Sequence, residues 1–600
     1  MPDRTAVAVS HRPLADRARA IVDREQASYI ERTRASQRAN ERARRVMPRG
    51  VPSSFQAYEP HPIVIGSATG SSMTDVDGNV YVDYDMGFGA LFAGHVHPAV
   101  RTAIESQLDH GTLYVSPCEA NAHVAELLAE RYELPMWRFT NSGTEATMDA
   151  IRVARGATGR HRIVKVEGGY HGHHDAVMIS TKPALRDAGD ARRPVPVASS
   201  AGITPATIAE TTVVPYNDLD ALEAALAADD VACFIVEPVL ENIGICLPQP
   251  GYLEGAREIT RRHGTLLIFD EVKTGITAGW SGATGVVGVR PDLVALAKSI
   301  GGGLPLGAFG GTRAVMDTIT DGTVVHLGTY NGNPLCMAAA RAVLEEVCTP
   351  SATDGAIARN GRLVDACETI IEDAGLPAHA VAFGAKGCVT WNPEPIRDYR
   401  DYRRNDHGIA YAQWLHGLNR GILLPPGLDE QWLISILHDE AASMRYAEVF
   451  ADFVAALGLL FLAAGFVLVV GVVALDDVDA HVVEHRVDVL DLVRGDFFRR
   501  QHRIQFIVGD EAALLGELDH PLDGGVVEIE QRPVGRFGHG GLTFGFLVLF
   551  LRHRHSLRSG AATQKRAAPK RAALDSINYG PRGIKPCLTT PGTLNSRLRR

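Results

Sequence analysis

The sequence predicts an α/β protein whose larger domain is built around a mostly parallel sheet. Between residues 100 and 345, amphipathic helix-like stretches alternate with short apolar runs rich in β-branched residues. These runs lack a polar alternation, as expected for strands covered by helices on both faces. They lie at 162–166, 232–236, 265–269 and 293–296. Ligands of such sheets bind at the carboxyl ends of the strands, so we expect the site there.

Length and composition place the chain in the ordinary globular class. Its 600 residues exceed what one hydrophobic core usually supports, so several domains are expected. A net charge of −10 is mild for this length and does not indicate a nucleic-acid partner. The eight cysteines form no CxxC pair, which favours a reducing cytoplasm over a disulfide framework. No apolar stretch follows the first basic residues, so no secretory signal is expected.

The first 99 residues are expected to form a helical arm and a hairpin. Residues 14–45 are rich in Ala and Arg and poor in β-branched residues, which predicts one or two surface helices that close at 47–50. Asp77-Gly78, followed by 80–84, predicts a hairpin. The fragment 75–79 resembles a calcium loop, but its glycine is fourth and no glutamate stands twelfth, so we interpret it as a turn.

After residue 99 we expect a large domain over 100–345 and a smaller α+β domain over 346–457. With the first 99 residues, these domains form the body of the protein. After it, residues 453–475 form an apolar run of 23 residues without a charge. A helix of that length would span a hydrocarbon core of about 30 Å, so membrane association is permitted through this segment alone. The remaining tail, 458–600, is of unknown fold. Its last 49 residues carry 12 Lys or Arg against one acid, which predicts disorder.

Lys298 is the candidate nucleophile. It ends the apolar run 292–298 and is followed by the glycine loop 301–307. A lysine held rigid and partly desolvated at a strand end has a lowered pKa, which makes it a usable amine for a Schiff base. The alternative is a lysine that merely extends from a strand end into solvent.

Two further motifs suit a phosphorylated heterocyclic cofactor. Ser142, Gly143 and Thr144 precede a helical run near Glu145, so hydroxyls and backbone N–H groups at a helix N-terminus can hold a phosphate. Plain helix capping is the alternative. Asp270 directly follows a buried strand, where a carboxylate suits a protonated ring nitrogen. A structural cap or salt bridge is the alternative.

The loop 168–175 offers an aromatic ring and several histidines. We interpret Tyr170 as a ring that stacks on a planar cofactor. Metal binding is conceivable, but no helical i, i+4 pair or remote cysteine set supports it, so no metal site is expected. The residues weighed for it are His171, His173, His174 and Asp175. Downstream, 328–334 opens another helix with hydroxyl and backbone donors, with Thr329 suited to the same phosphate.

Together these motifs resemble the fold-type I, class III pyridoxal-phosphate aminotransferases. The resemblance runs from about 43 to 457, and within the family the chain looks most like the glutamate-1-semialdehyde 2,1-aminomutases. The similar blocks are 44–51, 94–98, 141–148, 169–173, 270–272, 301–308 and 332–335. The family fold has a large, seven-stranded type of α/β/α domain and a smaller α+β domain formed by both ends of the body.

The resemblance implies a homodimer that binds pyridoxal 5'-phosphate, with pyridoxamine 5'-phosphate as the alternate form. Lys298 would carry the cofactor and shuttle a proton, and Asp270 would keep the ring nitrogen protonated. Thr329 would complete the phosphate site of the second subunit. The implied cofactor contacts are Ser142, Gly143, Thr144, Tyr170, His171, Asn242, Asp270, Val272, Lys298 and Thr329.

The resemblance implies a small amino compound as the substrate, and the choice of substrate is expected to depend on the loop 424–435. That loop contains no arginine, which class III ω-transaminases often use to bind a carboxylate, and Glu430 matches a glutamate of the mutases. An acid there can select an amino group; an exposed turn acid is the alternative. The stretch 85–90 and the pair Gln431-Trp432 depart from the mutase pattern.

The expected reaction is therefore intramolecular amino transfer that gives 5-aminolevulinate. The alternative within the family is an intermolecular transaminase that moves an amino group between an amino acid or amine and a keto acid or aldehyde. A hypothesis of another class is a membrane-tethered, non-catalytic protein built around 453–600. We expect instead that the tail is an unrelated appendage or translation past the natural stop.

Overall fold

The computed structural model describes residues 12–426, 431–458, 466–473, 526–539 and 542–554. The chain divides into two units, Met1–Leu462 and Ala463–Arg600. The first unit holds all of the cofactor-site motifs named above, and the two units are described separately.

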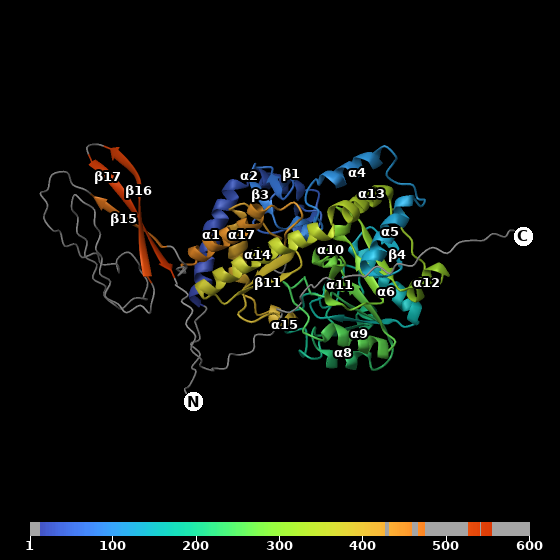
Figure 1. Ribbon diagram of the computed structural model, residues 1–600. Coiled ribbons are helices and arrows are strands. Elements are labelled where there is room, and N and C mark those ends of the chain that lie inside the picture. The colour runs from blue at the N-terminus through green and yellow to red at the C-terminus, as the bar shows by residue number, and fades with distance from the viewer. Residues whose placement is uncertain (1–11, 427–430, 459–465, 474–525, 540–541, 555–600) are drawn as a thin grey trace, which may run out of the picture. The chain divides into compact units, whose positions relative to one another are not determined.

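A seven-stranded sheet forms the centre of the larger domain in the first unit (Figure 1). Its strand order is β4-β10-β9-β8-β7-β5-β6. The strands are β4 (Met136–Thr140), β5 (Arg162–Val166), β6 (Thr211–Val214), β7 (Val231–Val236), β8 (Leu266–Asp270), β9 (Leu293–Leu296) and β10 (Gly307–Gly311). Only β10 runs antiparallel to its neighbours. The mostly parallel sheet predicted from the apolar runs is confirmed.

Helices cover this sheet on both faces, as the apolar runs predicted. All six residues of β7 are buried, and β9 is buried throughout, because each strand has side chains packed above and below. The helices of this domain include α4 (Pro98–Leu108), α5 (Glu119–Tyr132), α6 (Gly143–Thr158), α7 (Pro205–Ala209), α8 (Leu219–Leu226), α9 (Tyr252–Arg262), α10 (Gly275–Ala278), α11 (Gly282–Val287), α12 (Arg313–Thr320) and α13 (Pro334–Ala342).

The smaller domain joins the two ends of the body. In one sheet of order β1-β2-β3-β13, β13 (Ile422–Leu423) runs parallel to β3 (Val80–Asp83), with Ile422 opposite Val82. The hairpin predicted at Asp77-Gly78 is the antiparallel pair β2–β3. The other elements are β1 (Ile65–Thr69), β2 (Ser72–Asp75), β11 (His379–Phe383), β12 (Lys386–Thr390), β14 (Trp432–Leu433), α3 (Met86–Gly89), α14 (Pro350–Ala374), α15 (Tyr399–Tyr402), α16 (His407–Leu418) and α17 (Glu440–Ala456).

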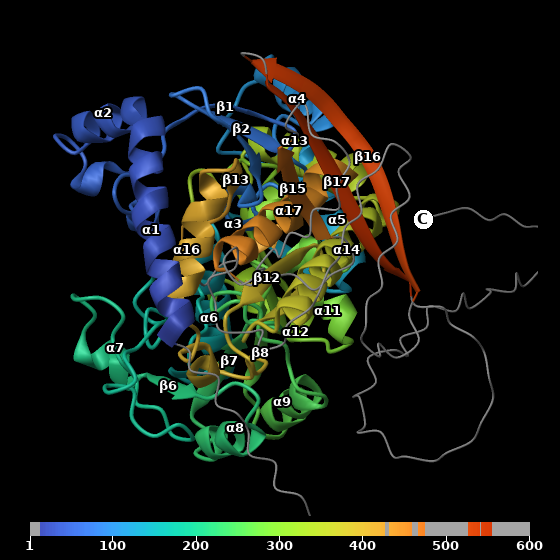
Figure 2. The ribbon, with the colours of Figure 1, turned by 90° about the vertical axis from the view of Figure 1, so that its left-hand side faces the viewer.

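The predicted N-terminal arm forms two helices, α1 (Arg12–Arg32) and α2 (Arg34–Ala43). Figure 2 shows α1 beside α16, and the two helices share buried contacts. The calcium-like fragment is a turn: the Asp75 carboxylate accepts hydrogen bonds from the backbone N–H groups of Asp77 and Asn79 at 3.0 and 2.8 Å. This carboxylate therefore stabilises the hairpin.

The apolar run 453–475 does not form the single helix expected from its length. Helix α17 ends at Ala456, and Gly458 follows with a φ of 70°. The Arg17 guanidinium donates to the Leu457 carbonyl at 2.8 Å, which satisfies the helix end. Further along, β15 (Phe466–Val473) is a strand, consistent with its many valines. In the described part of the chain, no helix is both long and apolar enough to span a bilayer.

The second unit contains one described sheet of order β15-β17-β16. Its other strands are β16 (Val526–His539) and β17 (Leu542–Arg554), and both pairings are antiparallel. Most of the basic end, from 555 onward, lies outside the described residues.

Candidate active site

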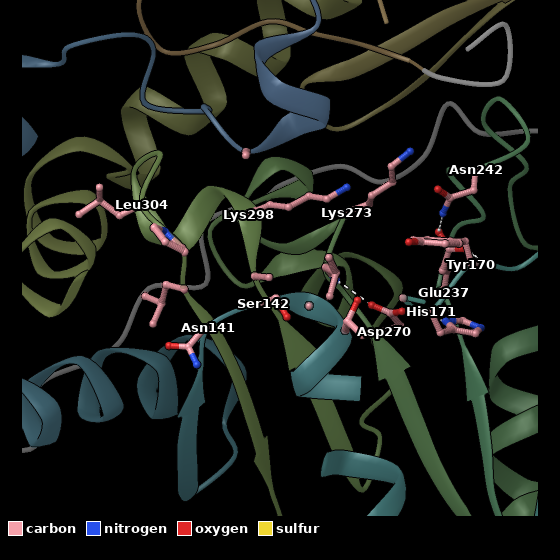
Figure 3. Close-up of a pocket in the computed structure, with 18 of the residues that line it drawn as sticks. Asn141, Ser142, Tyr170, His171, Glu237, Asn242, Asp270, Lys273, Lys298 and Leu304 are labelled. Atoms are coloured by element: carbon pink, nitrogen blue, oxygen red, sulfur yellow. Dashed lines mark hydrogen bonds and ion pairs between the residues drawn. The ribbon is translucent and has the colours of Figure 1, made fainter. Parts of the chain in front are cut away.

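A cavity of about 520 Å³ opens where the strands of the large sheet end (Figure 3). Lining residues follow five strands, β4, β5, β7, β8 and β9, and this is the edge at which parallel sheets bind ligands. Its volume is that of a small-molecule site. The polar lining residues are Asn141, Ser142, Thr144, Tyr170, His171, Glu237, Asn242, Asp270, Lys273 and Lys298.

The N-terminus of α6 forms one wall of the cavity. Ser142 is the N-cap residue, and its hydroxyl accepts a hydrogen bond from the Glu145 backbone N–H at 3.2 Å. The capping interpretation is therefore correct for this side chain. It does not exclude an anion, because the helix still directs its first backbone N–H groups and its positive dipole end toward the cavity.

Two glycines bring the backbone close around this helix end. A Cβ atom on Gly143 would lie 2.8 Å from Cγ1 of Val272, and one on Gly172 would lie 2.7 Å from both Cα and Oγ1 of Thr144. Gly172 also has a φ of 96°, which L side chains rarely adopt. The Thr144 hydroxyl lies 3.0 Å from Nδ1 of His173. We call Ser142, Gly143, Thr144 and Gly172 the phosphate cup: its two glycines leave no room for side chains, and its hydroxyl and backbone N–H donors suit a phosphate group.

Asp270 also lines the cavity, at the end of β8. Its Oδ2 lies 2.8 Å from Nδ1 of His171, and its Oδ1 accepts from the Val272 backbone N–H at 3.0 Å. Burial lowers the pKa of His171, although the Asp270 charge acts against this shift. A neutral His171 donates through Nδ1–H to the Asp270 carboxylate. A buried carboxylate held in this way suits a cationic ring nitrogen.

The histidine loop holds no recognisable metal site. Among the residues that the structure describes, no cluster of three or more His, Cys, Asp or Glu has the arrangement of metal ligands. His171 is directed to Asp270 and His173 to Thr144, so both histidines contact residues that line the cavity. Tyr170 lines the same cavity and is 41% exposed, which leaves its ring accessible to a planar ligand.

A buried glutamate supports the ring side of the cavity. The Glu237 carboxylate accepts from the Tyr170 backbone N–H at 3.0 Å, the Asn242 side-chain amide at 2.8 Å and the Glu241 backbone N–H at 3.2 Å. Burial, and next the negative charge of Asp270, raise its pKa to about 7. Glu237 thereby fixes Tyr170 and Asn242 relative to each other.

Lys298 extends into the cavity directly after β9. Figure 3 shows its side chain above Ser142 and Asp270. Its φ is 53°, in the left-handed region that non-glycine residues rarely occupy. Such strained backbone is found most often at functional sites, where the surrounding fold holds the residue in place. The side chain is half-buried.

A second lysine, Lys273, also lines the cavity. Its ammonium donates to the Glu241 carbonyl at 2.5 Å and lies 3.5 Å from Oε1 of Gln431. The Glu241 carboxylate instead pairs with Lys386 at 2.7 Å, and both of those side chains are buried. Gln431 also donates to the carbonyls of Glu241 and Gly244. This cluster links the large domain to the C-terminal segment.

Some residues proposed from the sequence lie elsewhere. Thr329 is exposed and does not line the cavity of its own chain, and Glu430 lies outside the described residues. Of the stretch 85–90, only Ala90 lines the cavity. Trp432 is buried in the core of the smaller domain and donates to the Asn360 side chain at 2.7 Å, so it does not face a substrate.

The sequence analysis missed Asn141, Gly172, Glu237 and Lys273 as cavity residues. Glu237 had a usable signal, because it follows a buried strand as Asp270 does. The sequence signal for Lys273 was weaker: it stands three residues after Asp270. Asn141 adjoins Ser142, and its side chain bonds Glu145 and Asn331 at 3.1 and 3.0 Å.

Comparison with known proteins gives consistent matches over the body of the chain. The family model described as aminotransferase class-III matches residues 54–376. A glutamate-1-semialdehyde 2,1-aminomutase from Methanocella arvoryzae is 40% identical over 405 residues, 66% of this chain and 93% of the relative.

Solved structures point the same way. A variant of a glutamate-1-semialdehyde aminomutase from Pseudomonas aeruginosa PAO1, in complex with PMP, matches with a TM-score of 0.68 and 32% identity. That match covers 74% of this chain and 99% of the other. An omega-transaminase from Sphaerobacter thermophilus matches with a TM-score of 0.66 and 34% identity, covering 71% and 97%.

Proposed function

Because the chain belongs to the class-III aminotransferase family, and is thus a pyridoxal-phosphate-dependent enzyme, we propose that it is a glutamate-1-semialdehyde 2,1-aminomutase. The reaction would move an amino group between neighbouring carbons of one substrate and give 5-aminolevulinate. The 40% identity to a glutamate-1-semialdehyde 2,1-aminomutase favours this reaction, and the cavity that places Lys298, Asp270 and the N-terminus of α6 around one space supports its cofactor chemistry. The cavity thus offers the three groups that this cofactor needs: an amine, a carboxylate for the ring nitrogen and donors for the phosphate.

Each part of the cavity then has a task. When bound, pyridoxal phosphate supplies an aldehyde carbon that accepts an amino group and a ring that withdraws electrons. Ser142, Gly143 and Thr144 hold the phosphate by hydroxyl and backbone N–H donors at the end of α6. Asp270, oriented by His171, keeps a proton on the ring nitrogen. Lys298 Nζ anchors the cofactor and moves a proton to and from the substrate carbon.

The proposed residue roles can be tested without following turnover. Borohydride reduction of the holoenzyme should fix the cofactor covalently on the peptide that contains Lys298, as seen by mass spectrometry. A label on the Lys273 peptide instead would overturn the assignment of the nucleophile.

The mutase reaction has its own test. The purified protein should convert glutamate-1-semialdehyde to 5-aminolevulinate with no added amino donor. Protein that carries the cofactor but needs a separate donor would exclude the mutase and leave an intermolecular transaminase.

That transaminase is the second candidate, and specific observations favour it. The omega-transaminase structure is as similar in fold as the mutase. In addition, Ala90 lines the cavity from the stretch 85–90, and the cavity residue Lys273 contacts Gln431; the stretch 85–90 and the pair Gln431-Trp432 both depart from the mutase pattern. Against it, the cavity has no arginine among its described lining residues.

We also propose a homodimer in which Thr329 completes the partner's phosphate site. Thr329 is exposed, and Val325, Leu327 and Tyr330 around it are 61%, 84% and 60% exposed, an apolar surface that suits a protein contact. A mixture of Lys298→Ala and Thr329→Glu variants should regain activity, because one hybrid site contains neither change. If the mixture stays inactive although hybrids form, Thr329 does not act across subunits.

A cytoplasmic location remains a further proposal. All seven cysteines in the described part of the chain are unpaired thiols, as expected in a reducing compartment. Cell fractionation against marker proteins tests it.

A further inference from the structure

Glu237 stands in the middle of the strand ends that form the cofactor cavity. Strands β9, β8, β7 and β5 are consecutive neighbours in the large sheet. Lys298, Asp270, Glu237 and Tyr170 stand at or shortly after the ends of these four strands, in the same order. Glu237 is buried, and burying a carboxylate is costly unless its oxygens are hydrogen-bonded. Its hydrogen-bond partners therefore indicate its role.

Two backbone N–H groups fix both carboxylate oxygens of Glu237 as acceptors. Oε1 accepts from the Tyr170 N–H at 3.0 Å, and Oε2 accepts from the Glu241 N–H at 3.2 Å. Oε2 also accepts from the side-chain amide nitrogen of Asn242 at 2.8 Å, and Figure 3 shows Glu237, Tyr170 and Asn242 grouped at one side of the cavity. An ionised carboxylate only accepts, so Asn242 must direct its nitrogen, and not its oxygen, toward Glu237.

The charges near Glu237 decide when it is ionised. Burial, and next the negative charge of Asp270, raise the pKa of Glu237 to about 7, and the charge of Lys273 acts against this shift. Burial lowers the pKa of Lys165, and the Glu237 charge acts against that shift in turn. At a pH well above 7, Glu237 is therefore an acceptor for all three N–H groups.

The orientation of the Asn242 amide decides what this side chain offers to a ligand. Asn242 is buried and lines the cavity. Its amide nitrogen carries two N–H groups, and one of them donates to Glu237. The second can donate to an acceptor in the cavity. Pyridoxal phosphate has such an acceptor, the phenolic oxygen beside its aldehyde carbon.

We propose that Glu237 is a positioning residue that turns the Asn242 amide so that its second N–H group donates to the phenolic oxygen of the cofactor. The inference rests on the proposed function, because it requires pyridoxal phosphate in this cavity. In the opposite orientation the amide oxygen would take the place of the nitrogen, and the phenolic oxygen would lose its donor. Glu237 thus acts on the cofactor through Asn242.

Glu237→Gln tests this role with little change in side-chain size. One end of a glutamine side chain is an NH2 group, so it cannot accept at both ends as the carboxylate does. The longest hydrogen bond, from the Glu241 N–H, is the least costly to lose. Losing it places the NH2 group against Asn242, whose amide then turns its oxygen toward that group. The dissociation constant of pyridoxal phosphate should rise about 10- to 100-fold, as expected for a lost hydrogen bond to a charged acceptor.

A second variant separates this role from a merely structural one. Asn242→Ala removes the donor itself and should weaken cofactor binding to a similar extent. Adding Glu237→Gln to Asn242→Ala should change the dissociation constant less than about 3-fold, because no amide is left to turn. Each constant is measured by equilibrium titration of the apoenzyme with pyridoxal phosphate at a pH well above 7. The absorption maximum of the bound cofactor should also shift in each variant, since its phenolic oxygen loses a donor.

Glu25→Gln is the matched control. Glu25 is also buried and accepts from a side-chain amide, that of Asn419 at 2.9 Å, but it is not among the described residues that line the cavity. This variant should bind the cofactor with wild-type affinity and an unchanged absorption maximum.

The outcomes distinguish the inference from the proposed function. If Glu237→Gln binds the cofactor as the wild type does, or weakens binding equally with and without Asn242, the inference is wrong while the proposed function stands. Should Glu237→Gln fail to fold, wild-type affinity in Asn242→Ala alone overturns the inference. If the wild-type apoenzyme does not bind pyridoxal phosphate, the proposed function itself fails, and the inference with it.

Discussion

Replacing Gly172 with alanine tests whether the backbone cup around the N-terminus of α6 holds the cofactor phosphate. The new Cβ would lie 2.7 Å from Cα and Oγ1 of Thr144, a separation that real Cβ atoms do not show. Either the loop or Thr144 must move. The φ of 96° adds backbone strain for any L side chain.

The expected magnitude follows from that strain. A residue held in a sparsely populated backbone region costs about 1–3 kcal/mol. If the phosphate cup must adopt its native geometry to bind phosphate, this free-energy cost weakens the binding of pyridoxal phosphate by the same amount. Since 1.4 kcal/mol corresponds to tenfold, the dissociation constant of pyridoxal phosphate should rise about 5- to 140-fold.

The assay is equilibrium titration of the apoenzyme with pyridoxal phosphate, followed by absorbance. Gly361→Ala is the matched control, because it lies within α14 with nothing within 4 Å of the added Cβ. It should leave the affinity unchanged. Wild-type affinity in a folded Gly172→Ala protein would refute the proposed phosphate cup.

Three other changes have defined outcomes. Lys298→Ala should abolish the borohydride-fixed cofactor adduct while Lys273→Ala keeps it; an adduct on both would contradict a single anchoring lysine. Lys386→Met should lower the urea midpoint by leaving the Glu241 carboxylate buried and unpaired, at a cost of about 3–5 kcal/mol, and adding Glu241→Leu should restore most of it. No recovery in the double variant would disprove the pairing argument. Burial lowers the pKa of Lys165 to about 7, so wild-type stability falls as pH drops from the unfolded value of about 10.5 to about 7 and is level below. Lys165→Met should therefore raise Tm more at pH 6 than at pH 9; equal gains at both pH values would show that Lys165 does not titrate in this way.

The strands of the large sheet could be predicted because each strand leaves a recognisable hydrophobic pattern in the sequence. Each buried parallel strand is a continuous apolar run, and β5 and β9 have the predicted bounds. The motif residues Asp270 and Lys298 could be found for the same reason, since each stands where such a run stops. Local sequence was sufficient wherever the site is built directly on a strand end.

The residues that were missed depend on contacts distant in sequence. Lys273 resembles a surface lysine until the Glu241 carbonyl and the Gln431 amide, 32 and 158 residues away, are placed against it. The place of Trp432 in the loop 424–435 predicts a substrate contact, yet its ring fills the space above Gly387, where a Cβ would lie 2.6 Å from the indole. The apolar run 453–475 was misjudged because hydropathy does not register the helix end at Gly458.

The left-handed backbone of Lys298 has an evolutionary consequence. Glycine or asparagine would adopt its φ of 53° at lower cost, so the fold alone would favour either over lysine. Lysine is thus retained at this position against the preference of the backbone. A descendant of this chain that is no longer selected for catalysis would gain stability by replacing Lys298. The residue found at position 298 in such a descendant would therefore show whether selection for catalysis had continued.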